Sequence, residues 1–227
     1  MKVMVLGATG LTGNLVVQAL LSRDTVEKVV VPLRRKIEPA HPKLEQHLVS
    51  FDQLPMHREI FKVDALVCCL GTTIKKAGSR EKFRQVDYEY ALTAAELAKE
   101  QGASTLILMS AVGASASSPV FYNRVKGELE NAVRELGFEN LSIYHPSLLL
   151  GERQEHRTAE SLGMAVMPVA NRLMMGPLRK YRSIEAETVA NAMANELDQL
   201  QGDQAGRPPL VRIHEFDGIM KLAWSQG

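Results

Sequence analysis

Three residues in the middle of the chain, Ser110, Tyr122 and Lys126, have side chains and a spacing that suit proton transfer. A phenol, with a pKa of about 10, is a poor acid or base at neutral pH, but a nearby ammonium group favours the phenolate. Tyr122 and Lys126 are four residues apart, so they share one face of a helix. A packing tyrosine beside a surface lysine has the same spacing. The serine twelve residues upstream favours a site, in which its hydroxyl would hold a substrate oxygen.

The surrounding sequence predicts the elements that must position these residues. The apolar run 104–109 predicts a buried strand that ends at Ser110, and 121–130 has the spacing of a helix. Other strands are expected at 3–6, 26–33, 46–51, 64–70, 140–144 and 210–213, and other helices at 11–21, 54–61, 83–101, 183–193 and 214–224. A polar loop is expected at 74–80. Alternating strands and helices predict an α/β fold, a doubly wound parallel sheet with helices on both faces and a small C-terminal substrate-side region.

The amino terminus carries a second pattern with chemical meaning. Gly7, Gly10 and Gly13 follow the first expected strand at three-residue intervals and lead into a helix. Glycine lets the backbone bend sharply and approach a pyrophosphate, and the N–H groups at a helix start supply donors. Tight turns also use glycine for steric reasons alone, but the position between strand and helix favours a dinucleotide site. Its expected contacts are Gly7, Thr9, Gly10, Leu11, Thr12 and Gly13.

The end of the second expected strand distinguishes between the nicotinamide nucleotides. In a dinucleotide fold an acidic residue here binds the 2′-hydroxyl of NAD, whereas an arginine accommodates the 2′-phosphate of NADP. Arg34 and Arg35 stand at this point, and the next acidic residue is Glu38. A guanidinium binds phosphate through two parallel hydrogen bonds. A solvated basic turn is the alternative, but the position favours NADP(H) over NAD(H).

Two further stretches would complete the cofactor site. Asp52 follows the third expected strand, where its carboxylate either accepts from the adenine amine or caps the next helix. Leu70 ends the fourth expected strand, and Gly71 and Thr72 follow it. Small residues at this point would let the cofactor lie close against the backbone.

Together these motifs resemble those of the atypical short-chain dehydrogenase/reductase family, the branch that shares features with sugar-nucleotide epimerases. The match rests on the glycine turn 7–13, Arg34-Arg35, Asp52, Ser110, Tyr122-x-x-x-Lys126 and His145-Pro146-Ser147. Within this branch the chain is similar to the Tat-interacting-protein group, also called the CC3 group. That similarity is carried by residues 68–73, 76–78, 95–99, 125–128 and 151–155, and it covers residues 1 to about 190.

The resemblance implies a single Rossmann domain, residues 1–227, in which residues 151–182 form a lid on the substrate side. It implies that Tyr122 is the general acid/base and that Lys126 binds the nicotinamide ribose and lowers the pKa of the tyrosine. Ser110 would orient the substrate oxygen.

Two other implications concern neighbours of this trio. His145, Pro146 and Ser147 would belong to the cofactor site, with the last two against the nicotinamide. Many relatives use an asparagine in the helix before the serine to organise a proton-relay water. This chain has no asparagine there, and Gln85 or Asp87 would have to replace it.

Bulk composition limits the partners. Lys and Arg total 27 against 26 Asp and Glu, and a net charge of +1 does not favour nucleic acid or an anionic membrane. Apolar runs are too short to span a bilayer. Cys68 and Cys69 are neighbours on an expected strand and point to opposite faces, which indicates a reducing compartment, and we expect a cytoplasmic protein. The six histidines are dispersed, so no metal site is predicted.

The leading functional hypothesis is an NADP(H)-dependent oxidoreductase that transfers hydride to or from a small carbonyl or alcohol not identified by the sequence. One alternative is an epimerase or dehydratase with bound cofactor. Another is a regulatory protein with little or no turnover, whose affinity for a partner depends on the bound nucleotide. The serine–tyrosine–lysine trio favours an enzyme. A methionine-rich stretch at 161–175 is compatible with a subunit contact, so the sequence allows a homodimer.

Overall fold

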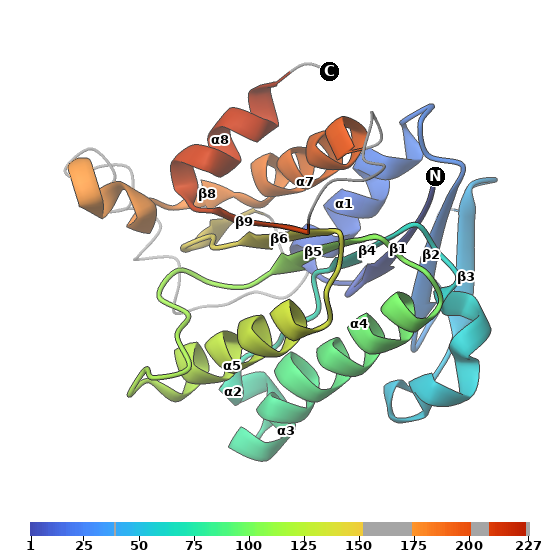
Figure 1. Cartoon of the computed structure of the whole chain (residues 1–227), viewed down its shortest axis with the longest axis horizontal. Helices are drawn as coiled ribbons and strands as arrows, with labels where there is room; N and C mark the ends of the chain where they lie inside the picture. Colours follow the sequence, from blue (N-terminus) through green and yellow to red (C-terminus); the bar gives the residue numbers. More distant parts are fainter. Residues whose placement is uncertain (39, 152–173, 201–208, 226–227) are drawn as a thin grey trace.

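Seven parallel strands form the central sheet of the computed structural model (Figure 1). The structure describes residues 1–38, 40–151, 174–200 and 209–225. The strand order is β3-β2-β1-β4-β5-β6-β9, so the chain builds one half outward from β1 and then the other half from β4. The strands are β1 (Lys2–Leu6), β2 (Lys28–Leu33), β3 (Leu44–Leu48), β4 (Ala65–Cys68), β5 (Thr105–Met109), β6 (Asn140–Tyr144) and β9 (Leu210–His214). This order confirms the predicted doubly wound α/β fold.

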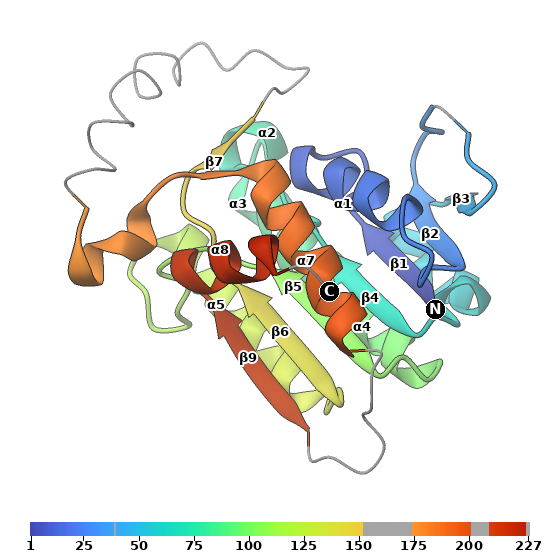
Figure 2. The ribbon, with the colours of Figure 1, turned by 90° about the horizontal axis from the view of Figure 1, so that it is seen from above.

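Helices cover both faces of the sheet. One face carries α1 (Leu11–Leu21), α7 (Ala186–Leu200) and α8 (Phe216–Trp224), onto which Figure 2 looks. The other face carries α4 (Tyr90–Glu100) and α5 (Phe121–Glu135). A short parallel pair, β7 (Leu149–Leu150) and β8 (Ile184–Glu185), lies beside the main sheet. Between its two strands, residues 152–173 of the expected lid lie outside the described residues, whereas Gly176–Tyr181 form a 3-10 helix, η3.

Alternation along the strands divides the hydrophobic core into two layers. In β1, Val3 and Val5 belong to the cluster under α1 and α7, whereas Met4 and Leu6 belong to the cluster under α4 and α5. All four side chains are fully buried, as expected for a parallel sheet that is covered on both faces. The two cysteines follow the same rule, with Cys68 in one cluster and Cys69 in the other, both as free thiols.

The predicted third strand and the helix after it are displaced. We expected the strand at 46–51, but β3 is Leu44–Leu48 and pairs with β2 from Val29↔Leu44 to Leu33↔Leu48. A 3-10 helix, η1 (Phe51–Phe61), replaces the expected helix at 54–61. β3 lies at the sheet edge and is only partly buried, so its polar sequence does not have the apolar signature of a central strand.

The expected loop at 74–80 is wrong, because it contains α2 (Ile74–Ala77) and the start of α3 (Arg80–Arg84). Each begins at a hydroxyl cap, since Thr73 accepts from the Lys76 N–H and Ser79 accepts from the Lys82 N–H. Helices this short leave no periodic pattern in the sequence.

The single long helix expected at 83–101 is broken by a π-helical turn, η2 (Gln85–Glu89), between α3 and α4. A π turn is wider than an α turn and shifts the faces of the residues that follow. Ala94, Leu97 and Ala98 are buried against the sheet. Tyr90 is only half-buried, and the residue that turns inward is Asp87.

A buried polar cluster joins α7 to the strands beneath it. The Glu196 carboxylate accepts from the hydroxyls of Ser142 and Tyr144, each at 2.7 Å, and lies 3.0 Å from His214 Nε2. Burial acts to raise the pKa of the Glu196 carboxyl, but the hydrogen bond and charge of His214, together with the two hydroxyls, outweigh it and hold the pKa below its usual 4.5. The ionised form is therefore favoured in the folded protein.

This lowered pKa predicts a pH-dependent contribution to stability. Glu196 stabilises the fold above pH 4.5, and the contribution is lost as the pH falls through the lower folded-state pKa. We expect Glu196→Gln to lower the free energy of unfolding by about 2 kcal/mol at neutral pH, and by progressively less in acid, measured by urea denaturation. Ser142→Ala should cost only about 1 kcal/mol. A Glu196→Gln deficit that does not change with pH would contradict the assignment.

Candidate functional site

The glycine turn lies between β1 and α1, where the strand order reverses. Gly7 has φ +81°, and a Cβ there would lie 2.6 Å from the Cys69 carbonyl oxygen. A Cβ on Gly13 would lie 2.1 Å from the Gly7 carbonyl oxygen. Neither position accepts a side chain, because the turn packs against itself and against the chain that leaves β4. Gly10 N–H closes the turn on the Gly7 carbonyl at 2.8 Å. This is the switch point at which doubly wound folds bind dinucleotides.

The start of α1 has the donors that a pyrophosphate requires. Gly10 is the N-cap residue, so no side chain caps the helix, and its first turn has no acidic residue. The first N–H groups of the helix are thus available to an anion. Thr12 Oγ1 is buried without a hydrogen-bond partner among the described residues. Thr9 is exposed and Leu11 half-buried at the same turn. These features fit a bound phosphate group.

Charged and aromatic side chains lie at the end of the expected site where the adenosine would bind. Arg34 and Arg35 are exposed directly after β2. Asp52 Oδ1 accepts from the Tyr90 hydroxyl at 2.5 Å and from Gln85 Nε2 at 3.2 Å. Burial and Asp52 raise the pKa of Tyr90 to about 12, and the positive charge of Arg34 acts in the opposite direction.

One alternative for this carboxylate is wrong. The residue at the N-cap of η1 is Ser50, so Asp52 does not cap that helix. Its binding of Tyr90 was not predicted, because it depends on the shift introduced by the π turn.

Lys126 forms a buried ion pair with Asp87. The Lys126 Nζ and Asp87 Oδ1 atoms are 2.8 Å apart, and the side chains are 5% and 1% exposed. Asp87 Oδ2 also accepts from the Thr72 N–H at 2.8 Å, which ties the pair to the chain after β4. Burial acts to lower the pKa of Lys126, but Asp87 and Tyr122 outweigh it and raise the pKa. Lys126 is therefore a buried cation.

This ion pair distinguishes between the two residues considered for the missing asparagine. Asp87 contacts Lys126, whereas Gln85 contacts Asp52. Gly71 lies against the pair, since a Cβ there would be 3.3 Å from Asp87 Oδ1 and 3.7 Å from Lys126 Nζ. Leu70 is half-buried beside it. Whether Asp87 takes part in a proton relay stays a prediction.

Ser110 lies at the end of β5, and its hydroxyl donates to Glu130 Oε1 at 2.5 Å. The same carboxylate oxygen is 2.8 Å from His145 Nε2, and all three side chains are buried. Glu130 was not among the predicted site residues, because a glutamate in a charged helix resembles surface. Its spacing is the available signal, since Tyr122, Lys126 and Glu130 follow at intervals of four on α5.

The remaining predicted residues have contacts with the backbone. The Ser147 hydroxyl donates to the Arg182 carbonyl, and the Pro146 carbonyl accepts from the Val112 N–H at 3.0 Å. The Pro146 bond holds the segment after β6 next to the loop after β5, and the Ser147 bond holds it next to the residues before β8. The expected contact of Pro146 and Ser147 with a nicotinamide stays a prediction.

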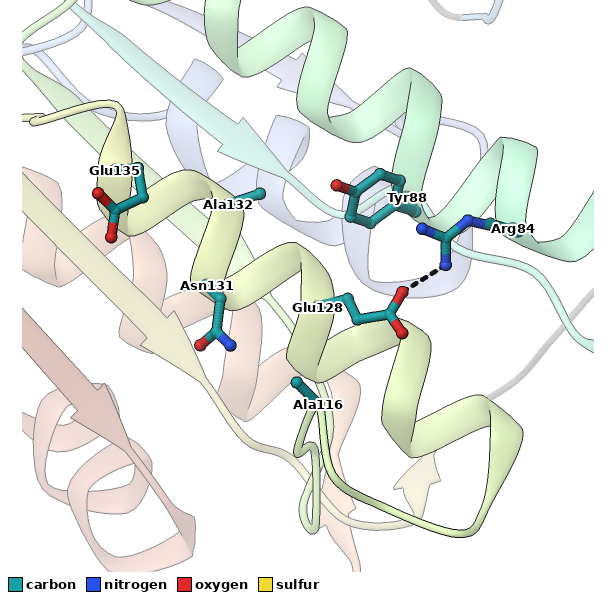
Figure 3. A pocket seen from close by; sticks show the side chains of 7 residues that line it. All are labelled: Arg84, Tyr88, Ala116, Glu128, Asn131, Ala132 and Glu135. Carbon is teal, nitrogen blue, oxygen red and sulfur yellow. Dashed lines mark hydrogen bonds and ion pairs between the residues drawn. The ribbon is translucent and has the colours of Figure 1, made fainter.

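A surface pocket of about 460 Å³ lies on the other side of α5 (Figure 3). It is lined by Arg84, Tyr88, Ala116, Glu128, Asn131, Ala132 and Glu135. At 3.6 residues per turn, the α5 members of this set face away from Lys126. The Arg84 guanidinium pairs with Glu128 and lies 4.4 Å from the centre of the Tyr88 ring, so α3 and η2 are braced against α5. The pocket is thus separate from the buried ion pair. The Arg84–Glu128 pair, which lines the pocket, also holds α3 against the helix that carries Lys126.

Within the described residues, no helix is long and apolar enough to cross a membrane. In the same ranges, no group of three or more histidine, cysteine, aspartate and glutamate side chains is placed to hold a metal ion.

Comparison with known proteins places the chain among nucleotide-binding proteins. Residues 7–142 match the family described as NAD(P)H-binding. The chain is 42% identical over 165 residues to rat protein HTATIP2, covering 71% of this chain and 68% of the relative. It is 30% identical over 210 residues to the mitochondrial protein fmp52 of Aspergillus fumigatus, covering 89% of each chain.

Solved structures give the same fold at low sequence identity. A UDP-glucose 4-epimerase from Thermotoga maritima, solved with UDP-glucose, aligns with a TM-score of 0.69 and 15% identity, covering 98% of this chain and 81% of that chain. The protein MoeE5 in complex with UDP-glucuronic acid and NAD aligns with a TM-score of 0.66 and 14% identity, covering 94% and 75%. Identities this low support the fold alone.

The expected cytoplasmic location is wrong. Fungal relatives, including those of Aspergillus fumigatus and Candida albicans, are named as mitochondrial proteins. The expectation relied on unpaired cysteines, which indicate a reducing environment without distinguishing one reducing compartment from another.

Four features point to the same family. They are the glycine turn, the order of the seven strands, the serine–tyrosine–lysine trio and the sequence identity to the relatives. The chain belongs to the NAD(P)H-binding, atypical short-chain dehydrogenase/reductase family that includes HTATIP2 and FMP52.

Proposed function

We propose that this protein is an NADP(H)-dependent oxidoreductase that transfers hydride to or from a small carbonyl or alcohol. The nicotinamide nucleotide would supply or accept the hydride. The observation that carries the proposal is the buried Lys126–Asp87 ion pair one helical turn from Tyr122. Burying a cation is costly for stability, and a lysine one helical turn from a tyrosine is typical of a site for proton transfer.

The residues that would hold the nucleotide follow the carboxyl edge of the sheet. The glycine turn, with Thr12, would bind the pyrophosphate, and Arg34 and Arg35 would bind the 2′-phosphate. Asp52 has a second carboxylate oxygen with which to accept from the adenine amine. Gly71 would let the nucleotide approach the buried ion pair.

Three side chains would act on the substrate or beside it. Tyr122 would hold or release a proton at its phenolic oxygen. The Lys126 ammonium would donate a hydrogen bond to a ribose hydroxyl. Ser110 would orient the substrate through a hydrogen bond. Asp87 would keep the ammonium charged within the protein.

The first prediction concerns nucleotide choice. In parallel thermal shift titrations, NADPH at a hundredfold excess over its Kd should stabilise the protein by about 2.7 kcal/mol, and the same concentration of NADH should stabilise it less. Arg34→Ala/Arg35→Ala should remove this preference. Arg58→Ala, which removes an exposed arginine paired with Glu100, is the matched control and should retain it. Equal stabilisation of the unmodified protein by both nucleotides would contradict the assigned role of the arginines.

The second prediction concerns the proton. Tyr122→Phe should reduce turnover by a factor of about 10²–10⁴, the usual contribution of a general acid/base, while NADPH binding changes little. Turnover is measured as NADPH consumption with a panel of small carbonyls. Tyr88→Phe, in the separate surface pocket, should behave like the unmodified protein. Full activity of Tyr122→Phe would exclude its role, and substrate conversion without NADPH consumption would favour the epimerase alternative.

The third prediction concerns the ion pair. Asp87→Asn leaves the Lys126 ammonium buried without its counter-charge, so the free energy of unfolding should fall by about 3 kcal/mol. Adding Lys126→Met should recover part of this loss in urea denaturation, but thermal shift should show that the double variant binds NADPH weakly, because it lacks the ammonium proposed to bind the ribose. Additive effects of the two substitutions on stability would show that the residues do not act as a pair.

A further inference from the structure

The side chain of Gln46 holds the loop that carries Arg34 and Arg35. Gln46 lies in β3, the edge strand next to β2 (Figure 1). Its Oε1 atom accepts from the Ile37 N–H at 2.9 Å, and its Nε2 atom donates to the Ile37 carbonyl at 3.0 Å. One side-chain amide thus pairs with both backbone groups of one residue, as a neighbouring strand would. Ile37 is two residues beyond Arg35, so the bonds fix the backbone next to the arginines.

The register of the sheet explains why Gln46 reaches this loop. Gln46 pairs with Val31 of β2, whose side chain belongs to the core cluster under α1 and α7. Paired residues of adjacent strands point to the same face, so Gln46 points to this face as well. Ile37 packs against the same cluster. The chain that leaves β2 therefore meets the Gln46 amide on the α1 side of the sheet.

The side chains of Arg34 and Arg35 have no tether of their own among the described residues. Both are exposed, and neither forms an ion pair or a hydrogen bond with another described residue. Unpaired guanidinium groups suit a phosphate, which they bind through parallel hydrogen bonds. Their position then depends on the backbone that Gln46 holds. A phosphate that had to order this backbone itself would bind less tightly, because ordering a chain costs entropy.

We propose that Gln46 is a positioning residue for nucleotide choice, which holds the turn after β2 so that Arg34 and Arg35 receive the 2′-phosphate of NADP(H). This inference rests on the nucleotide choice in the proposed function. It adds a residue of the neighbouring strand on which that choice depends, whereas the usual sequence rule considers only the end of β2.

The test compares 2′,5′-ADP with 5′-AMP, which differ only in the 2′-phosphate and contain no nicotinamide. The affinity of each for the whole chain is measured by isothermal titration calorimetry. The unmodified protein should bind 2′,5′-ADP about a hundredfold more tightly, the effect of charged hydrogen bonds from arginine to phosphate. The ratio of the two affinities therefore reports on the 2′-phosphate alone.

The central variant is Gln46→Met, which removes both hydrogen bonds to Ile37 and keeps the length of the side chain. It should reduce the ratio of affinities about tenfold, because 2′,5′-ADP must then order the turn. The affinity for 5′-AMP should stay the same. A purely structural role of Gln46 would instead weaken both nucleotides alike.

Two further proteins serve as controls. Glu45→Gln, on the same edge strand, removes a charge paired with Lys2 and should leave the ratio unchanged. In the Arg34→Ala/Arg35→Ala protein, Gln46→Met should have no additional effect on the ratio, because Gln46 acts through the arginines. Melting temperatures identify any variant that fails to fold. If Gln46→Met fails, Gln46→Asn, whose amide is one methylene shorter, takes its place.

The outcomes separate the inference from the proposed function. An unchanged ratio in Gln46→Met, an equal loss of both nucleotides, or a further loss in the protein without the arginines would overturn the inference and leave the function intact. Equal affinities of the unmodified protein for both probes would overturn the role of the arginines together with the inference. A ratio that depends on Gln46, in a protein that consumes no NADPH with any carbonyl, would support the inference and count against the oxidoreductase function.

Discussion

The buried ion pair between Lys126 and Asp87 is the constraint on which the rest of the site depends. Two opposite charges are held 2.8 Å apart where water does not reach them, and each would be strongly unfavourable alone. The pair requires that η2 and α5 stay in contact, and the Arg84–Glu128 pair on the outer side of α5 holds them there. It also requires space, which the glycine at position 71 supplies. The packing of η2 against α5 and the absence of a side chain at position 71 are therefore both needed for the ion pair.

Side chains of β6 and of the residue after it bind buried carboxylates on both faces of the sheet. Ser142 and Tyr144 point to Glu196 on α7, whereas His145, with the opposite orientation, points to Glu130 on α5. The first cluster lies in the hydrophobic core and links α7 to β6 and β9, which makes it structural. The second begins at Ser110, at the edge of the sheet where ligands bind in this fold. Glu196 and Glu130 are thus bound on opposite faces of the sheet, because successive side chains along β6 and just after it point in opposite directions.

The sequence was sufficient for features that depend on local geometry. The glycine turn needs only a strand, a tight bend and a helix, and its residues lie within thirteen positions. The spacing of Tyr122 and Lys126 likewise depends on one helix. The sequence could not identify the partners of these residues. The contact between Asp87 and Lys126 depends on a π turn, and the burial of Glu130 depends on how α5 lies over β5 and β6. The edge strand β3 and the short α2 lacked a periodic signal for a different reason, since neither is deeply buried.

The partners matter because a trio of residue types does not specify the direction of each hydrogen bond. Serine, tyrosine and lysine at the expected spacing are compatible with a serine that donates to a carbonyl or one that accepts from a hydroxyl. Glu130 adds a partner that the trio does not reveal, because its carboxylate accepts from the Ser110 hydroxyl. Asp87 has a comparable effect on Lys126, since it offsets the cost of burial and keeps the ammonium charged. The side chains of the trio are therefore held by two carboxylates outside it, each placed by packing between elements that are distant in the sequence.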